Sequence, residues 1–270
     1  MTYASIDDRN RIENEMPWAE RDLPRTLYGL LSRTAAAFPD RPAVSYQLLS
    51  GPKDKAETLS WGALRDKVAQ AANLFRSLGI GETDVVAYVL PNANETIHTL
   101  LGGAVAGIVN PINPLLEPEQ IGAILRETGA KVVVTLKPFP KTDLERVGEG
   151  MQVRVQLEAG EETVLEVDLN RYLTPPKSWI VPLIRPKVAG QRHTDLKDFN
   201  KELAKQPKTL QFEDSGTDRV AAYFHTGGTT GMPKVAQHSH VGMLYNGWCS
   251  AAMMVRETDV LLCPLPMFHV

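Results

Sequence analysis

Between residues 85 and 135, short apolar segments alternate with longer segments whose apolar residues recur every three or four positions. The segments Val85–Leu90 and Lys131–Thr135, with another near Ile108, are typical of buried strands, and those between them of amphipathic helices. Apolar strands joined by helices are typical of a parallel sheet, because each crossover places a helix on one face of the sheet. We therefore predict an α/β fold with helix-covered, largely parallel sheets.

Local signals also predict where several helices begin and end. Ser60 is a suitable N-cap for a helix over residues 61–78, and Gly79 supplies its stop. Pro118 favours the start of a further helix, which Gly129 ends. Upstream, we expect a helix over residues 27–35 and a strand over residues 42–49.

A second feature is a ten-residue stretch that holds three glycines, three threonines and one lysine, His225-Thr226-Gly227-Gly228-Thr229-Thr230-Gly231-Met232-Pro233-Lys234. Glycine lets backbone N–H groups turn inward around an anion, threonine hydroxyls add donors, and lysine adds a positive charge. These groups together are suited to binding the phosphates of a nucleotide. On composition alone, an ordinary glycine-rich turn without a ligand is the alternative.

The stretch is not a Walker phosphate loop, in which Gly-Lys-Ser/Thr opens a helix. Gly231 and Lys234 are not adjacent, and Pro233 between them lacks the backbone donor that the start of a helix would contribute. The flanking segments Val220–Phe224 and Val235–Gln237 are typical of short strands. We therefore expect the loop to close a β-hairpin.

Residues Thr226 to Lys234 resemble the signature phosphate loop of the adenylate-forming enzymes, which include acyl-CoA synthetases, peptide-synthetase adenylation domains and firefly-type luciferases. Two positions depart from the family pattern, since His225 takes a usually aromatic position and Val235 replaces the usual glycine. The resemblance covers residues 26–136 and 218–270. Further similar segments follow in the family's order at Leu59–Leu64, Val85–Asn92, Ala106–Pro114, Ser239-His240 and Pro264–Val270.

The resemblance implies the activation of a carboxylate in two steps. The carboxylate attacks the α-phosphate of Mg-ATP to form an acyl-adenylate and pyrophosphate, and a thiol, usually that of coenzyme A, then displaces AMP. In these implied roles Lys234 and Thr229 assist catalysis, Thr229 also contacts Mg²⁺, and Phe268 and His269 line the passage for the acyl group. The phosphates are held by Thr226, Gly227, Gly228, Thr229, Thr230, Gly231 and Lys234.

The resemblance also implies a domain organisation. We expect a polar N-terminal tail over residues 1–24 and a partial AMP-binding N-terminal domain over residues 25–270, without the C-terminal domain. Residues 137–217 match the family least and are expected to form a variable, linker-like insertion. The family's adenine-pocket strand, ribose-binding aspartate and C-terminal lysine have no counterpart up to Val270, so the chain alone is expected to be incomplete for catalysis.

One apolar segment of that insertion, Trp179–Lys187, lies in a basic part of the chain. Between Pro175 and Lys208 there are eight Lys or Arg residues and three acidic residues. A membrane-facing amphipathic helix is one interpretation, but Pro182 and Pro186 disfavour a helix. We prefer a linker packed across the domain surface, with weak peripheral membrane contact as the alternative.

Composition argues against several other classes of protein. The net charge of −3 indicates no general attraction to nucleic acid. The longest apolar run, Leu100–Val109, is too short to span a bilayer. Only Cys249 and Cys263 are present, which excludes a disulfide framework and favours a reducing cytosol, with Cys263 expected in the apolar core. Ser239-His240 is interpreted as the cap of the next helix rather than part of a hydrolase triad. We expect a soluble, cytoplasmic protein.

Two alternatives to an acyl-CoA synthetase acting on a fatty or related acid stay open. One is an adenylation module that loads a carrier protein, which the Pro-Met-Phe-His segment at residues 266–269 and the insertion disfavour. The other is a non-catalytic protein that keeps the loop as a relic of nucleotide binding.

Overall fold

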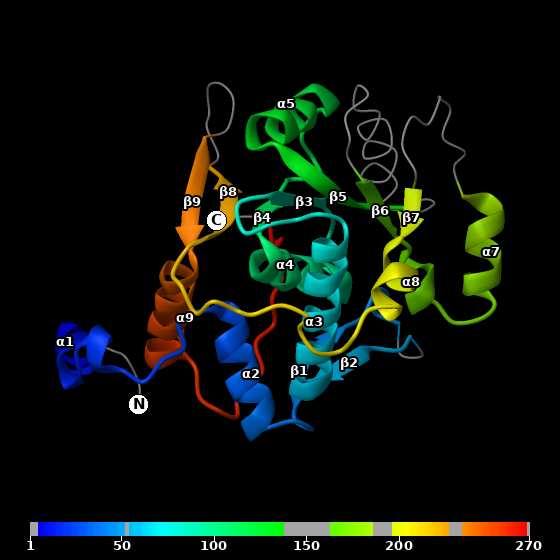
Figure 1. Ribbon diagram of the computed structural model, residues 1–270. Helices are drawn as coiled ribbons and strands as arrows, with labels where there is room; N and C mark the ends of the chain where they lie inside the picture. Colours follow the sequence, from blue (N-terminus) through cyan, green and yellow to red (C-terminus); the bar gives the residue numbers. More distant parts are fainter. Residues whose placement is uncertain (1–4, 52–53, 138–162, 186–195, 227–233, 269–270) are drawn as a thin grey trace.

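A seven-stranded, mostly parallel sheet with the order β7-β6-β5-β3-β4-β8-β9 forms the centre of the protein (Figure 1). The computed structural model describes residues 5–51, 54–137, 163–185, 196–226 and 234–268. Among the described strands of this sheet, only β9 is antiparallel to its neighbour, and β1 and β2 pair separately as an antiparallel ribbon. The strands are β1 (Pro42–Tyr46), β2 (Glu57–Ser60), β3 (Val85–Val89), β4 (Ile108–Pro111), β5 (Ala130–Leu136), β6 (Thr163–Val167), β7 (Leu196–Asp198), β8 (Val220–His225) and β9 (Val235–Ser239).

Helices cover both faces of this sheet. Figure 1 shows α5 on one side, and α3 and α4 on the other. None of the described helices is long and apolar enough to cross a membrane. The described helices are α1 (Ile6–Glu15), α2 (Leu27–Ala37), α3 (Trp61–Ser77), α4 (Asn94–Ala106), α5 (Pro118–Thr128), α7 (Lys177–Ile184), α8 (Phe199–Ala204) and α9 (His240–Met254), with 3₁₀ turns η1 (Trp18–Glu20) and η2 (Leu169–Tyr172).

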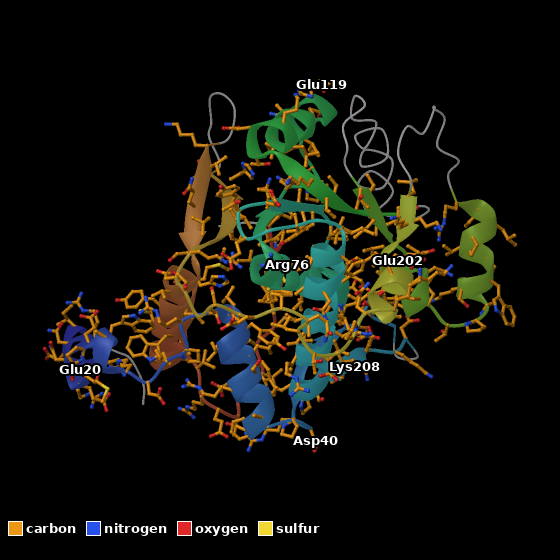
Figure 2. All side chains as sticks on the ribbon, viewed as in Figure 1. Glu20, Asp40, Arg76, Glu119, Glu202 and Lys208 are labelled. Atoms are coloured by element: carbon orange, nitrogen blue, oxygen red, sulfur yellow. The ribbon has the colours of Figure 1, made fainter. Side chains whose placement is uncertain are left out.

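The core lies between the sheet and these helices, where side chains fill the layers (Figure 2). All five residues of β3 are buried, as expected for a central strand covered on both faces. Helices α3 and α4 cross closely because Gly102 has no side chain: a Cβ there would lie 2.5 Å from the Cβ of Ala71. The predicted α/β fold is confirmed.

The predicted helix boundaries are confirmed as well. The Ser60 hydroxyl accepts a hydrogen bond from the backbone N–H of Ala63 at 3.2 Å, and α3 ends before Gly79, which has φ = +86°. Gly129 ends α5 in the left-handed region at φ = +62°. Positive φ favours glycine because it has no Cβ, so both stops have a local physical cause.

Two segments for which the sequence predicts no helix or strand, the linker-like insertion and the polar N-terminal tail, have regular structure. The range expected as a linker-like insertion contributes β6 and β7, which extend the main sheet beyond β5. In the polar N-terminal range, α1 and η1 form, and Trp18 packs edge-on against Tyr245 and Trp248 of α9 at centroid distances of 4.9 and 5.6 Å. Polar composition therefore does not prevent the tail from folding onto the domain.

Three interpretations made from the sequence are wrong. Residues 177–184 form helix α7 despite Pro182, because the proline lies in the last turn of an eight-residue helix and removes only one helical donor. This segment is also not a linker packed across the surface, since most of its apolar side chains are exposed. Cys263 is exposed rather than part of the core, because residues 261–264 pair with no described strand.

Candidate functional site at the carboxyl edge of the sheet

The stretch predicted to bind phosphates is flanked by the two strands of a β-hairpin, as expected. Strands β8 and β9 pair antiparallel, and the backbone N–H of Thr226 donates to the carbonyl of Lys234 at 2.9 Å. This bond closes the hairpin and brings the two ends of the loop together, with both side chains exposed. Residues Gly227 to Pro233, including Thr229, Thr230 and the three glycines, lie outside the described residues.

The hairpin extends from a sheet edge where ligands commonly bind. Strands β3, β4 and β8 are parallel neighbours, so their carboxyl ends meet at one edge of the sheet. In open α/β sheets, ligands bind outside the carboxyl ends of the strands. Strand β8 ends at this edge, and Thr226 follows it there as the first residue of the predicted loop.

The segment before Phe268 is held at the same edge. The hydroxyl of Tyr88, on β3, donates to the carbonyl of Met267 at 2.9 Å. Just after β3, the side-chain amide of Asn92 donates to the carbonyl of Leu265 at 2.8 Å and accepts from the N–H of Met267 at 2.9 Å. Phe268 follows and is partly buried, whereas His269 lies outside the described residues.

The two parts of the candidate site are separated by one strand. The loop leaves β8, residues 265–267 are bound beside β3, and β4 lies between them. Strands in a sheet lie about 4.8 Å apart, so the two positions are separated by roughly 10 Å along the edge. That spacing suits two parts of one ligand, such as a phosphate chain and an acyl group.

Three polar side chains stabilise the base of the hairpin. His225 Nε2 lies 2.7 Å from Asn110 Oδ1, Asn110 Nδ2 donates to the hydroxyl of Thr128 at 3.1 Å, and that hydroxyl donates to the carbonyl of Ile124. Since Asn110 uses its oxygen toward the ring, His225 carries its proton on Nε2. Burial lowers the pKa of His225, which favours this neutral form.

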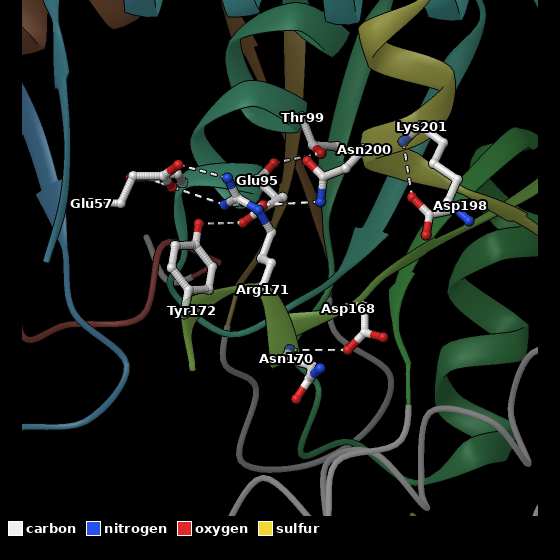
Figure 3. A network of polar contacts seen from close by, with 11 residues as sticks. Glu57, Glu95, Thr99, Asp168, Asn170, Arg171, Tyr172, Asp198, Asn200 and Lys201 are labelled. Atoms are coloured by element: carbon white, nitrogen blue, oxygen red, sulfur yellow. Dashed lines mark hydrogen bonds and ion pairs between the residues drawn. The ribbon is translucent and has the colours of Figure 1, made fainter. Parts of the chain in front are cut away.

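A second polar cluster lies around the first turn of α4 (Figure 3). The side chain of Glu95 is fully buried and accepts from Arg171 at 2.8 Å, Tyr172 at 2.7 Å and Asn200 at 3.1 Å. Arg171 also donates to both oxygens of Glu57, on β2. The cluster joins β2, η2 and α8 to the helix that follows Asn92.

The charges in this cluster stabilise one another. Burial raises the pKa of Glu57, but hydrogen bonds from Arg171 and Asn94 outweigh it and leave the pKa lowered. Burial and the neighbouring Glu95 carboxylate raise the pKa of Tyr172, so its hydroxyl remains a donor. Both terminal guanidinium nitrogens of Arg171 donate to carboxylates, those of Glu57 and Glu95. We therefore interpret this cluster as structural support.

Among the predicted site residues that the structure describes, Thr226 and Lys234 close the hairpin, and Phe268 follows the segment bound beside β3. Sequence reasoning singled out none of the supporting side chains. Asn92 and Asn110 lie in segments that resemble the family, but nothing in their local pattern indicates a distant partner. The resemblance to the family draws attention to the two segments that contain these residues. The partners of Asn92 and Asn110 become visible only in the folded structure.

The chain belongs to the AMP-binding enzyme family, whose model it matches over residues 31–270. It is 32% identical to the marinolic acid–CoA ligase of Pseudoalteromonas sp. (strain SANK 73390), over 98% of this chain and 38% of that protein. It is 28% identical to the long-chain-fatty-acid–CoA ligase of Bacillus subtilis (strain 168), over 97% of this chain and 44% of that protein. The chain thus spans less than half the length of these relatives.

Solved structures share this fold. The N-terminal domain of FACL13 from Mycobacterium tuberculosis matches 90% of this chain, with a TM-score of 0.63 and 19% identity, and the match covers 52% of that chain. A fatty acyl CoA synthetase of Mycobacterium tuberculosis matches 90% of this chain, with a TM-score of 0.64 and 20% identity, and the match covers 40% of that chain. At this identity the similarity concerns the fold alone.

Proposed function

We propose that residues Thr226 to Lys234 form the phosphate-binding part of an ATP-dependent ligase. This ligase activates a carboxylic acid as its adenylate and transfers the acyl group to coenzyme A. One observation carries the proposal: the Thr226–Lys234 hairpin tip and the segment before Phe268 occupy the same carboxyl edge, one strand apart. Membership of the AMP-binding family and the CoA ligases among its relatives support the same chemistry.

In the first step, a carboxylate oxygen of the acid attacks the α-phosphorus of Mg-ATP, and the bond to the pyrophosphate oxygen breaks. We assign Lys234, Thr226 and the intervening loop to the β- and γ-phosphates, where positive charge and N–H donors stabilise the leaving pyrophosphate. Thr229 is proposed to contact the Mg²⁺ that arrives with ATP. The main contribution of the site is to position the two reactants and to neutralise charge.

In the second step, the thiol sulfur attacks the acyl carbon of the adenylate, AMP leaves, and a thioester forms. We propose that Phe268 and His269 border the acyl group where it meets the adenylate. The relatives named above act on different acids, which are marinolic acid and long-chain fatty acids. We therefore propose a carboxylic acid of fatty or related type, without choosing its chain length.

The two alternatives predict different measurements. Formation of an acyl-CoA that depends on both the acid and Mg-ATP would support the proposal, whereas acyl transfer only to a carrier protein would indicate an adenylation module. A non-catalytic relic would bind neither ATP nor AMP.

Because the chain spans 38% and 44% of the two relatives, we propose that residues 1–270 alone bind ATP without normal ATP–pyrophosphate exchange. Exchange at a normal rate by this chain would contradict that point.

A further inference from the structure

Helix α7 presents an unusual set of apolar side chains to solvent. Trp179, Ile180, Leu183 and Ile184 are 68%, 48%, 84% and 56% exposed, respectively. These positions recur with the period of one helix face. Val181, by contrast, is only 8% exposed and attaches the helix to the domain. Exposing large apolar side chains to water is unfavourable, so a contiguous group of four indicates a surface that contacts something else.

The contacts around α7 keep this face directed outward. The side-chain amide of Asn170 donates to the carbonyl of Ser178 at 3.1 Å. At one end of the helix Lys177 forms an ion pair with Asp54 at 3.2 Å, and after the other end Arg185 forms one with Asp168 at 2.8 Å. The helix is therefore held in place at both ends, and its apolar face does not depend on a partner for its direction.

We infer that α7 is a docking surface for an anionic lipid bilayer. The helix contains no acidic residue, and the described residues 175–185 and 196–208 carry six Lys or Arg residues against two acidic ones. Charge of this sign attracts anionic headgroups, even though Lys177 and Arg185 also have carboxylate neighbours. Tryptophan beside aliphatic side chains is suited to the boundary between headgroups and acyl chains, where its ring is buried and its N–H stays hydrated.

The dimensions of α7 favour a lipid surface over the other occupants. A helix of eight residues is about 12 Å long, far shorter than the roughly 30 Å needed to span a bilayer. A stable protein interface uses about 20–30 residues on each side, whereas α7 offers four exposed apolar side chains. Shallow insertion of one short apolar face needs no larger area.

The test is co-sedimentation of the purified chain with vesicles made of equal parts phosphatidylglycerol and phosphatidylcholine, compared with vesicles of phosphatidylcholine alone. We expect the protein to sediment with the anionic vesicles and several-fold less with the neutral ones. Vesicles with brominated acyl chains should quench the tryptophan fluorescence of the wild type. In Trp179→Phe the quenching should be smaller by the part that Trp179 contributes. Absence of sedimentation with anionic vesicles, or equal sedimentation with both kinds, would overturn the inference.

A pair of matched variants identifies the surface involved. Leu183→Asp should lower the vesicle partition coefficient about 10-fold, because it places a carboxylate at the centre of the apolar face. Leu262→Asp changes the same residue type at 89% exposure in a second exposed apolar segment, and should leave binding within about twofold. The reverse ranking would assign the contact to residues 260–265 and contradict the proposal.

Measuring self-association distinguishes a lipid-binding surface from an interface between two copies of the chain. If the wild type forms a dimer in sedimentation velocity that Leu183→Asp abolishes, and neither protein binds vesicles, the surface is an interface between copies. Both variants replace exposed side chains, so their far-ultraviolet circular dichroism and unfolding midpoints should match the wild type. Since the inference does not depend on ATP chemistry, loss of vesicle binding and loss of ATP binding can be distinguished directly.

Discussion

The side-chain oxygen of Asn92 accepts a hydrogen bond from the backbone N–H of Met267 at 2.9 Å, across 175 positions of the chain. The same side chain donates to the carbonyl of Leu265 at 2.8 Å. One amide group therefore fixes the segment before Phe268 against the loop that follows β3. This relationship holds the segment before Phe268 beside the strand edge from which the β8–β9 hairpin also extends.

Replacing Asn92 should loosen this segment selectively. Asn92→Ala removes both hydrogen bonds, and we expect the amide of Met267 to exchange with solvent about 5- to 10-fold faster, since each bond contributes about 1 kcal/mol. Asn92→Asp keeps the acceptor for Met267 and should protect its amide better than Asn92→Ala does. Hydrogen exchange measured by mass spectrometry over residues 264–268 tests this, and equal exchange in all three proteins would contradict it.

The base of the hairpin should depend on a histidine donor. Asn110 is fully buried, so His225→Phe leaves its side-chain oxygen without its partner and should lower the free energy of unfolding by about 1–3 kcal/mol. His225→Gln keeps a donor and should cost less. Denaturant unfolding of both variants, combined with Asn110→Ala in a double-mutant cycle, measures the coupling. A coupling energy of zero would show that the two side chains act independently.

Much of the fold could be predicted because its signals are local. The N-cap at Ser60, the stops at Gly79 and Gly129, and the apolar run of β3 each act within a few residues of the chain. Helix α7 could not be predicted in the same way, because a proline such as Pro182 generally disfavours a helix. In the last turn, however, a proline costs only one backbone hydrogen bond.

The candidate site could be predicted in its loop but not in its supports. The Gly-Thr-Lys pattern is a property of ten consecutive residues, and the hairpin that Thr226 and Lys234 close follows from the flanking strands. The pairs Asn92–Met267 and Asn110–His225 join residues more than 100 positions apart. Such pairs depend on strand order, which no local pattern in a single sequence specifies.

The Glu95 cluster should be important for stability. Glu95→Ala leaves Arg171 partly buried with one carboxylate fewer and should destabilise the protein by about 3–5 kcal/mol, as expected when one partner of a buried ion pair is removed. The exposed pair of Glu202 and Lys205 provides the control, because Glu202→Ala should cost less than about 1 kcal/mol. Urea unfolding of both variants measures the difference, and similar losses would contradict a structural role for the cluster.

Stability should fall as the solution becomes acidic, through buried histidines. Burial lowers the pKa of His98 to about 3 and that of His240 to about 4, below the ordinary value of 6.5. Between these values the unfolded chain binds protons that the folded chain does not, so the free energy of unfolding decreases as pH falls from 6.5. Each histidine contributes a slope of up to about 1.4 kcal/mol per pH unit.

The variant His98→Leu isolates one of these contributions. Neither ring nitrogen of His98 has a hydrogen-bond partner among the described residues, so leucine removes the titrating group without breaking a described contact. We expect the difference in free energy of unfolding between variant and wild type to grow in favour of the variant from pH 7 to pH 5. A difference independent of pH would contradict the burial of a neutral His98.

The most direct test of the central claim is the dissociation constant of Mg-ATP, measured by titration calorimetry on the wild type, Lys234→Ala and Lys208→Ala. Both lysines are exposed, but Lys208, labelled in Figure 2, follows α8 and lies away from the hairpin. A charged hydrogen bond contributes about 1.5–3 kcal/mol, so Lys234→Ala should weaken binding about 10- to 100-fold. Lys208→Ala should leave the dissociation constant within about twofold of the wild type. Equal affinity in all three proteins, or no measurable ATP binding by the wild type, would contradict a phosphate site at the Thr226–Lys234 hairpin.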